Sequence, residues 1–415
     1  MAQQVRPDRI MNAAADSPPW LRSRFAWLAR RHEVLLAGTI LAVLALTSVF
    51  DARHLYWNDP WVSAVDIIRQ TSLLGIFSLG TAIVIIAGGI DLSSGSVIAF
   101  SGTVCASLMM LLAPEEMRSY QPLGTWVIAA AIAGTLATGV LIGSLHAWLI
   151  TVIGLPPFVA TLATLVGLRS FGRLLVEGVN QSTQIQVADA QFRYLATSVW
   201  IPAVLFLLLA AAAWLLMSRT VVGRHFYALG GNEAAARLSG IRTDRLKWLA
   251  YVLSATSASL AGILYIGDQA VADPQTLGRG YELNAIAAAV VGGCSLQGGV
   301  GTMPGVVLGV LFLRVVIDSV AKLIKAQADV YEGMIVGLLV VVAVALNQLR
   351  QPGAARRGFF SGSLGIVAGA TLALTAMVLG MLLVGRSTGA TIGFAVVVGV
   401  IVARFAERRR NVNPF

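Results

Sequence analysis

Very few residues in this sequence have the type and spacing that catalysis requires. The chain contains three lysines, Lys247, Lys322 and Lys325, and none completes the G-x-x-x-x-G-K-[ST] pattern of a phosphate-binding loop. Its four histidines show no metal-ligand spacing. The one G-x-S-x-G match, at 385–389, connects two apolar runs and lacks the strand that precedes a nucleophilic serine. We therefore predict that the chain is not an enzyme and uses neither a metal nor a cofactor.

The most informative chemical pattern is a glycine-rich sequence that occurs twice. Residues 88–95 and 292–299 both follow G-G-x-[DS]-L-x-x-G, and each copy lies between two apolar segments. Paired glycine-interrupted breaks indicate a transport pathway, because unwound backbone is tolerated in a membrane only beside protein or a water-filled cavity. Asp91 and Ser93 would offer polar groups to a hydroxylated solute. Alternatively, Asp91 caps the helix that begins near Ser93, and both roles can coexist.

The composition places these breaks in a membrane protein. Of the 415 residues, 57% are apolar and 12% are charged, whereas soluble proteins carry about 25% charged residues. A chain so poor in charge cannot cover its surface in water. Soluble enzymes, disordered chains and secreted scaffolds are therefore excluded, and Cys105 and Cys294 do not form a disulfide framework.

Apolar segments of membrane-spanning length recur along the chain. A window of about 19 residues crosses about 30 Å of hydrocarbon. This window predicts spans at 34–50, 72–89, 96–113, 125–150, 157–177, 199–217, 248–267, 304–320, 331–347, 362–385 and 388–404. The shorter run 283–293 covers about half the membrane, so it is the end of a broken helix or a re-entrant segment. The predicted fold is an all-α, polytopic transmembrane helical bundle with about ten core spans, two extra C-terminal spans and broken or re-entrant Gly-rich segments.

The basic residues predict the orientation of this bundle. Residues 1–33, 218–247, 350–361 and the C-terminal tail carry 19 of the 30 Lys and Arg residues. Cytoplasmic segments of membrane proteins are enriched in Lys and Arg, so both termini and the 218–247 loop are predicted to be cytoplasmic. The net charge of +10 then follows from topology, and we expect no nucleic-acid partner.

The 218–247 loop contains the pattern of a short capped helix. Asn232 can cap a helix over 233–239, which Gly240 would end. Such a short Ala-rich helix is marginal alone in water. We expect it to rest in a groove of a soluble cytoplasmic partner. The alternative is a helix that lies on the anionic inner leaflet with its Arg residues at the headgroups.

Three charged residues lie on one face of the helix predicted after Pro156 and Pro157. Arg169, Arg173 and Glu177 are spaced four residues apart. A local Arg173–Glu177 ion pair with snorkelling at the outer end of the span is favoured over contact with a solute.

Four sequence blocks, taken in order, resemble one protein family. They are GGIDLS at 88–93, LPPFVATL at 155–162, GR at 223–224 with ALGGNEAA at 228–235, and GYELNAIAA at 280–288 followed by VGG at 291–293. Together they resemble the membrane permease of bacterial ribose-type monosaccharide ABC importers, over about residues 72–346. Two features depart from that pattern. Gly240 lies seven residues after Glu233, which differs from the E-A-A-x-x-x-G spacing of general permeases, and the pair of spans at 362–404 extends beyond the permease core.

The resemblance implies a permease that transports a monosaccharide across the bacterial inner membrane. It also implies three protein partners: a second permease copy forming a homodimer, a cytoplasmic ATPase subunit docked on the 218–247 loop, and a periplasmic sugar-binding protein. One alternative is a related importer of another small solute, such as a branched-chain amino acid or a nucleoside. Another is an ion-coupled secondary transporter, which needs acidic residues within spans, where Asp91 and Asp318 are nearly the only candidates.

The predicted domain organisation follows from these patterns. Residues 1–33 form a cytoplasmic tail, and 34–347 form the permease core with the coupling loop 218–247. Residues 348–361 form a basic cytoplasmic linker, and 362–415 form an additional transmembrane hairpin with a basic tail.

Two sets of site residues are predicted from these blocks and breaks. The substrate pathway is expected to be lined by Asp91, Ser93, Phe158, Thr161, Glu282, Asn284, Ser295 and Gln297. The ATPase subunit is expected to dock on Gly231, Asn232, Glu233, Ala235, Arg237 and Gly240. Glu282 is the position with the closest alternatives: it either caps the short helix that follows it or gates transport, with Arg279 and Tyr281 completing an external docking surface. We favour gating.

Overall fold

The computed structural model describes residues 32–51, 54–323, 332–339, 341, 391 and 395–401. The chain forms two units, 1–343 and 344–415. Most of the predicted 1–33 tail and of the 362–415 hairpin, and the whole 348–361 linker, lie outside the described residues. In the second unit, residues 395–401 are helical.

Seven helices among the described residues are long and apolar enough to cross a membrane. They are α3 (His32–Phe50), α5 (Pro60–Ile86), α6 (Ser94–Leu112), α8 (Thr125–Thr151), α9 (Pro157–Asn180), α11 (Trp200–Arg219) and α14 (Thr243–Gln269). Each matches a predicted span, and a helical membrane bundle is confirmed. The largest difference is the start of α5, which begins at Pro60 rather than at residue 72. Its N-terminal half carries the polar residues Arg69 and Gln70, which lower the mean hydropathy of a segment that is nevertheless helical.

Two further helices belong to the predicted core. α15 (Tyr281–Val291) has 11 residues, which confirms a half-length helix at the short apolar run. α16 (Met303–Leu323) covers the predicted 304–320 span, but it carries Arg314, Asp318 and Lys322 and is not among the seven apolar helices. The last core span, predicted at 331–347, is described only at 332–339 and 341, all helical.

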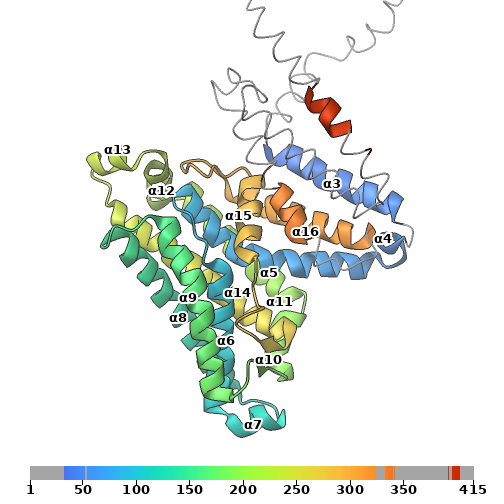
Figure 1. The fold of residues 1–415 in the computed structure, drawn as a ribbon, viewed down its shortest axis with the longest axis vertical. Helices are drawn as coiled ribbons and strands as arrows, with labels where there is room; N and C mark the ends of the chain where they lie inside the picture. Colours follow the sequence, from blue (N-terminus) through green and yellow to red (C-terminus); the bar gives the residue numbers. More distant parts are fainter. Residues whose placement is uncertain are drawn as a thin grey trace, which may run out of the picture. The chain divides into compact units, whose positions relative to one another are not determined.

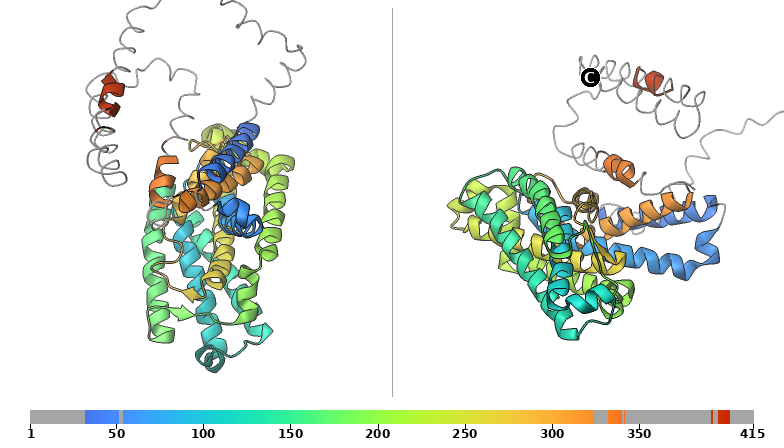
Figure 2. Two further views of the ribbon diagram at one scale, coloured as in Figure 1. Left: turned by 90° about the vertical axis from the view of Figure 1, so that its right-hand side faces the viewer. Right: turned by 60° about the horizontal axis from the view of Figure 1, so that its bottom comes forward.

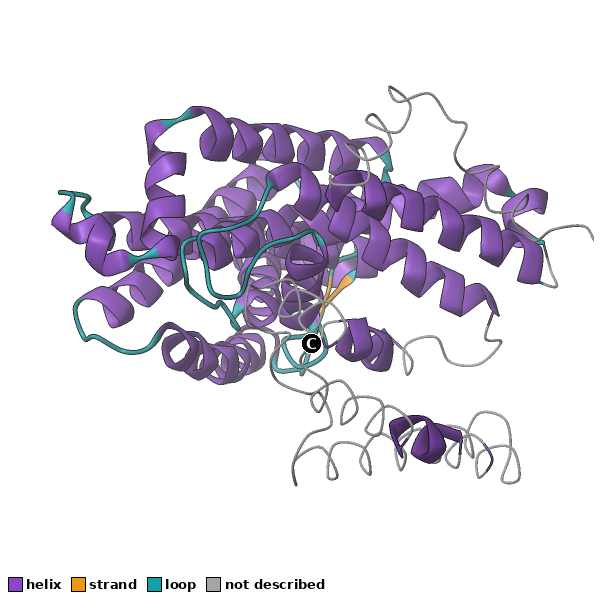
Figure 3. Ribbon diagram, turned by 90° about the horizontal axis from the view of Figure 1, so that it is seen from above, coloured by secondary structure: helices purple, strands orange, loops and turns teal. Residues whose placement is uncertain are grey.

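Short elements connect the long helices. They are α4 (Leu55–Asn58), α7 (Pro114–Ser119), α10 (Ala190–Thr197), α12 (Val221–Gly231), α13 (Glu233–Leu238), β1 (Ile185–Gln186) and β2 (Val271–Ala272). The strands pair antiparallel, with Ile185 opposite Ala272 and Gln186 opposite Val271. Figure 3 shows these two strands among helices that form nearly all of the described chain.

The core of the first unit lies around three helices. α5, α6 and α14 bury two thirds or more of their most apolar segments, whereas α3, α9 and α11 bury less than a third. α14 packs against α5, α6 and α8, and α9 packs on α6. α16 lies between α3 and α5 (Figures 1 and 2), and Leu36 and Ile40 of α3 form an apolar cluster with Phe312 and Val315 of α16. The central helices are therefore enclosed, whereas the outer ones leave most of their apolar residues exposed.

Candidate functional site

Both glycine-rich breaks meet at one end of the bundle, and α12 joins them there. The Gly299 N–H donates to the carbonyl oxygen of Ile86 at 2.9 Å. A Cβ placed on Gly298 would lie 2.8 Å from Gly88 Cα and 2.7 Å from the Gly230 carbonyl oxygen. Gly88 and Gly298 also adopt φ values of +84° and +85°, which glycine reaches without strain. We call this contact of residues 88, 230, 298 and 299 the glycine junction.

A cavity of about 340 Å³ opens beside the glycine junction. Its polar lining comes from the α12–α13 connection, α14 and the second break, with the side chains of Asn232, Glu233, Lys247, Tyr251 and Gln297. Gln297 is exposed. One predicted pathway residue, Gln297, and three predicted docking residues, Gly231, Asn232 and Glu233, therefore border the same cavity.

α12 is bound to the second break as well as to the first. Thr220 caps α12 by accepting a hydrogen bond from the Gly223 N–H at 3.1 Å. The Tyr227 hydroxyl donates to the Gly301 carbonyl oxygen at 2.9 Å, and Phe226 and Leu229 are buried. A displacement of α12 must consequently move backbone of both breaks.

α13 forms as the sequence predicts. Asn232 Oδ1 accepts from the Ala235 N–H at 2.9 Å, and Gly240 follows the helix with φ +82°. Ala236 is buried, whereas Ala235 is exposed and Leu238 is 91% exposed. The tip of α13 therefore presents one fully accessible apolar side chain.

Charged side chains fix α13 against α14. Lys247 Nζ lies 2.7 Å from Glu233 Oε1, and Arg237 lies 3.3 Å from Glu233 and 3.2 Å from Asp244. Burial alone would raise the pKa of Glu233, but the hydrogen bond and charge of Lys247, together with Arg237, hold that pKa below its ordinary value. Glu233 is therefore ionised at neutral pH and helps to orient the predicted docking helix.

The first break is held by the side chain of Asp91, which is 1% exposed. Asp91 Oδ1 accepts from the Ser93 N–H at 2.9 Å and from the Ser93 hydroxyl at 2.6 Å, and Oδ2 accepts from the Ser254 hydroxyl at 2.7 Å. Because α6 begins at Ser94, these bonds brace the turn before the helix and tie it to α14. They differ from the expected cap, in which the carboxylate meets N–H groups inside the first turn of the helix.

Thr161 attaches the same break to α9. Its buried hydroxyl accepts from the Leu92 N–H at 3.2 Å and donates to the Pro157 carbonyl oxygen at 3.0 Å. Three residues further along α9, the Thr164 hydroxyl lies 2.7 Å from Nε2 of the fully buried His146. The structure thus brings Asp91, Ser93 and Thr161 together, and it adds His146 and Ser254, which no sequence motif indicated.

We expect Asp91→Asn to destabilise the protein by about 1–3 kcal/mol, because hydrogen bonds to a buried charged acceptor are replaced by weaker ones. The measurement is the thermal unfolding of the purified protein in detergent. Asp59→Asn, at an exposed position, is the control and should change stability little. Equal stability of the two variants would show that the Asp91 carboxylate does not hold the break.

The other pathway predictions fall in separate places. Phe158 is 51% exposed on α9. Ser295 Oγ accepts from the Gln297 N–H at 3.2 Å within the second break. Asn284 donates to Glu332 Oε1 at 2.8 Å, and Arg314, on α16, lies 3.8 Å from that oxygen and donates to Gln70 at 2.7 Å. Arg314, Glu332 and Gln70 form a polar cluster that was missed, because each residue is isolated in the sequence.

Glu282 lies over the start of α6. A Cβ on Gly95 would overlap the Glu282 carboxylate and the Gly278 carbonyl oxygen, so only glycine fits beneath it. Among the described residues, Glu282 Oε2 is buried without a hydrogen-bond partner. The neighbouring Tyr281 ring stacks on Phe77, with 6.1 Å between centroids. Tyr281 is therefore half-buried, with its ring packed on α5.

Arg169 braces the loop before α15. Its guanidinium donates to the carbonyl oxygens of Pro274 at 3.0 Å, Leu277 at 3.1 Å and Gly278 at 3.2 Å. The Arg173–Glu177 ion pair is confirmed at 2.7 Å. Arg169 has a distinct role that its spacing alone did not reveal.

We expect Glu282→Gln to fold and assemble but to lose much of its transport-linked activity. The amide cannot replace the negative charge beside the start of α6 and the Arg169-bound loop, where an anion contributes about 0.3–1 kcal/mol or more. The measurement is ATP hydrolysis by the chain reconstituted with the ATPase subunit and the loaded binding protein that the sequence resemblance implies. Glu115→Gln, at an exposed carboxylate on α7, is the matched control. Full stimulation in Glu282→Gln would assign this carboxylate a purely structural role.

The chain is similar to known permeases over most of its length. The family described as "branched-chain amino acid transport system / permease component" matches residues 63–344. The ribose import permease of Escherichia coli K12 is 32% identical over 334 residues, which cover 79% of this chain and 96% of the relative. A probable ABC transporter permease of Sinorhizobium fredii is 36% identical over 357 residues, covering 84% and 98%. The galactose/methyl galactoside import permease of E. coli K12 is 32% identical over 325 residues, covering 75% and 94%.

No solved structure matches the chain. Among the described residues, no group of three or more His, Cys, Asp or Glu side chains could hold a metal ion.

The family match and the relatives confirm the resemblance that the four sequence blocks carry. They also identify a multi-pass inner-membrane protein with a transport role. The chain therefore belongs to the family of ABC transporter permeases described as the branched-chain amino acid transport system / permease component.

Proposed function

We propose that this chain forms the pathway by which an ABC importer carries a monosaccharide across the bacterial inner membrane. The single observation that carries the proposal is the glycine junction, where α12 contacts both breaks of the pathway. A force applied to the α12–α13 loop therefore reaches both breaks through backbone contacts. The sugar class is supported by relatives named as ribose, galactose and allose permeases.

In this proposal a separate ATPase subunit supplies the force. It docks on α13, where Ala235 and Leu238 are exposed and Glu233, Arg237 and Lys247 fix the helix. The chain itself hydrolyses nothing, as expected for the permease component of a transporter. Motion of α13 passes to α12 through the shared residue Asn232 and then to residues 88 and 298.

The basic residues support a cytoplasmic position for α12 and α13. The start of α3 lies at the same end, since Glu33 accepts from the Thr302 hydroxyl at 3.0 Å just after the second break. β1, β2, α7 and α10 then lie at the outer end. We propose ten core crossings within residues 34–347, where α15 and the loop before it count as one crossing. A basic linker at 348–361 and two additional C-terminal spans follow the core. Both termini are proposed to be cytoplasmic.

The outer face of α9 is proposed to line the pathway beside a second copy of the chain. Ser170, Arg173 and Glu177 are exposed on this helix, and the ion-paired side chains are 52% and 43% exposed. Charged side chains exposed to hydrocarbon are costly, so this face is better suited to water or to protein than to lipid. Phe158 lies on the same helix nearer the cytoplasmic end. A periplasmic binding protein would deliver sugar at the opposite end of α9.

The test is uptake by proteoliposomes that contain the permease, its ATPase and its binding protein. Radiolabelled pentoses and hexoses are compared with leucine, because the family description names branched-chain amino acids. We expect ATP-dependent accumulation of at least one sugar. Accumulation of leucine alone would support the second candidate, an importer of branched-chain amino acids. Accumulation driven by an ion gradient without ATP would contradict both.

A further inference from the structure

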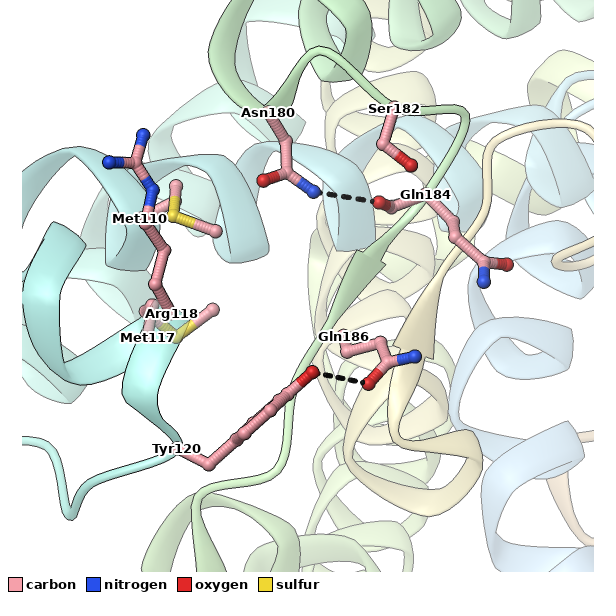
Figure 4. Close-up of a pocket in the computed structure, with 8 residues that line it drawn as sticks. All are labelled: Met110, Met117, Arg118, Tyr120, Asn180, Ser182, Gln184 and Gln186. Atoms are coloured by element: carbon pink, nitrogen blue, oxygen red, sulfur yellow. Dashed lines mark hydrogen bonds between the residues drawn. The ribbon is translucent and has the colours of Figure 1, made fainter.

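A polar pocket of about 270 Å³ lies at the outer end of α6 and α9. Figure 4 shows its side chains around a central opening, with Tyr120 on one side and Asn180 and Ser182 across from it. The lining comes from the end of α6, from α7 and from the connection between α9 and β1. It consists of Met110, Met117, Arg118, Tyr120, Asn180, Ser182, Gln184 and Gln186.

The lining offers hydrogen bonds around an apolar floor. Met110 and Met117 are buried, whereas Tyr120 is 61% exposed and Gln186 is exposed. Three amides, two hydroxyls and one guanidinium supply both donors and acceptors. The lining contains no carboxylate. The lining therefore gives the ammonium group of an amino acid no charged partner, whereas a neutral polyhydroxylated molecule needs only the hydrogen bonds that these residues offer.

The pocket is held open by contacts that do not depend on a ligand. The Tyr120 hydroxyl donates to Gln186 Oε1 at 2.9 Å, and Asn180 donates to the Gln184 carbonyl oxygen at 3.0 Å. Gln186 belongs to β1, which pairs with β2. The buried Asp189 accepts from the Leu123 N–H at 2.9 Å and joins the segment after α7 to the start of α10. Preformed sites lose little conformational entropy on binding.

We infer that this pocket is an external subsite for a monosaccharide, where sugar is received before it enters the pathway along α9. The inference rests on the proposed function and adds a site and a ligand class to it. The size of the pocket supports a ligand smaller than a drug, since pockets for drug-sized ligands hold about 300–1,000 Å³.

The experiment measures binding of radiolabelled ribose to the purified permease in nanodiscs, without ATPase or binding protein. We expect weak, saturable binding of ribose. Unlabelled ribose should compete for this binding, and leucine should not. Gln186→Leu should weaken it about 2- to 10-fold, as the loss of one or two hydrogen bonds predicts. Gln191→Leu, an exposed amide on α10 outside the lining, is the matched control and should bind as the parent does. Both variants are checked for monodispersity.

The outcomes separate this inference from the proposed function. If the intact complex imports ribose but the permease alone shows no saturable binding of ribose, only the subsite is overturned. The same conclusion follows if the complex imports ribose and the Gln186→Leu variant binds it as tightly as the parent does. If Gln186→Leu binds ribose normally but needs more binding protein for half-maximal ATPase stimulation, the pocket is a protein-docking surface and the inference is wrong. Failure of the complex to import any sugar would overturn the proposed function itself.

Discussion

Gly230→Ala is expected to reduce sugar uptake by the reconstituted complex at least about tenfold. A Cβ at this position would overlap the carbonyl oxygen of Ile86 and lie 2.5 Å from the Gly299 N. Both obstacles are backbone atoms, so no side chain can rotate away, and overpacking of this kind costs about 1–3 kcal/mol. The glycine junction would be forced apart, and α12 would no longer hold both breaks in register. Uptake and ATP hydrolysis are measured on the same proteoliposomes.

Gly38→Ala is the matched control. It adds the same methyl group on α3, away from the glycine junction, where no described atom lies within 4 Å of the new Cβ. We expect uptake close to that of the parent. Size-exclusion profiles and complex yield identify any variant that fails to fold. Normal uptake by a folded Gly230→Ala complex would show that close backbone contact at the junction is not needed for transport.

Ala235→Arg is expected to abolish co-purification of the ATPase subunit while the permease remains folded in the membrane. Ala235 is exposed on α13, and a long charged side chain there would block a partner groove without disturbing the buried Ala236. Transport should fall to background, since no force reaches α12. Ala235→Ser, which keeps the small side chain, should retain both complex and transport.

The same variant tests the membrane-surface alternative for α13. If this helix lies on the anionic inner leaflet, an additional Arg should leave the ATPase bound and strengthen binding to anionic lipid by about 1 kcal/mol. Normal complex yield and normal transport in Ala235→Arg would therefore contradict the docking role.

Helix positions were largely predictable because local sequence determines them. α8 and α9 begin and end within a few residues of the predicted spans, since Gly124, Pro156 and Pro157 interrupt the apolar runs. The Asn232 cap and the end of α13 at Gly240 follow from residue type in the same way. α5 was predicted too short, because Arg69 reduces local hydropathy and its partner Asp268 is 199 residues away.

The arrangement of the site was less predictable, because its contacts join distant segments. The repeated G-G pattern indicated two breaks but not that α12 packs between them, which depends on contacts of Gly230 with Ile86 and Gly299. Ser254 and Asp91 are separated by 163 residues, and no local pattern in either segment specifies the other. Arg169 likewise donates hydrogen bonds to backbone carbonyl oxygens. Every residue type has such an oxygen, so no sequence pattern identifies these partners.

The central claim, that the glycine-rich breaks border the transport pathway, is tested most directly by the reactivity of Ser93→Cys. Ser93 is fully buried in this structure, as are Cys105 and Cys294, which are replaced by alanine for the experiment. In the complete complex we predict slow modification by a water-soluble thiol reagent at rest and faster modification when ATP and loaded binding protein drive turnover. Complete protection of Ser93→Cys in every nucleotide state would mean that the break is dry packing, and it would contradict the account.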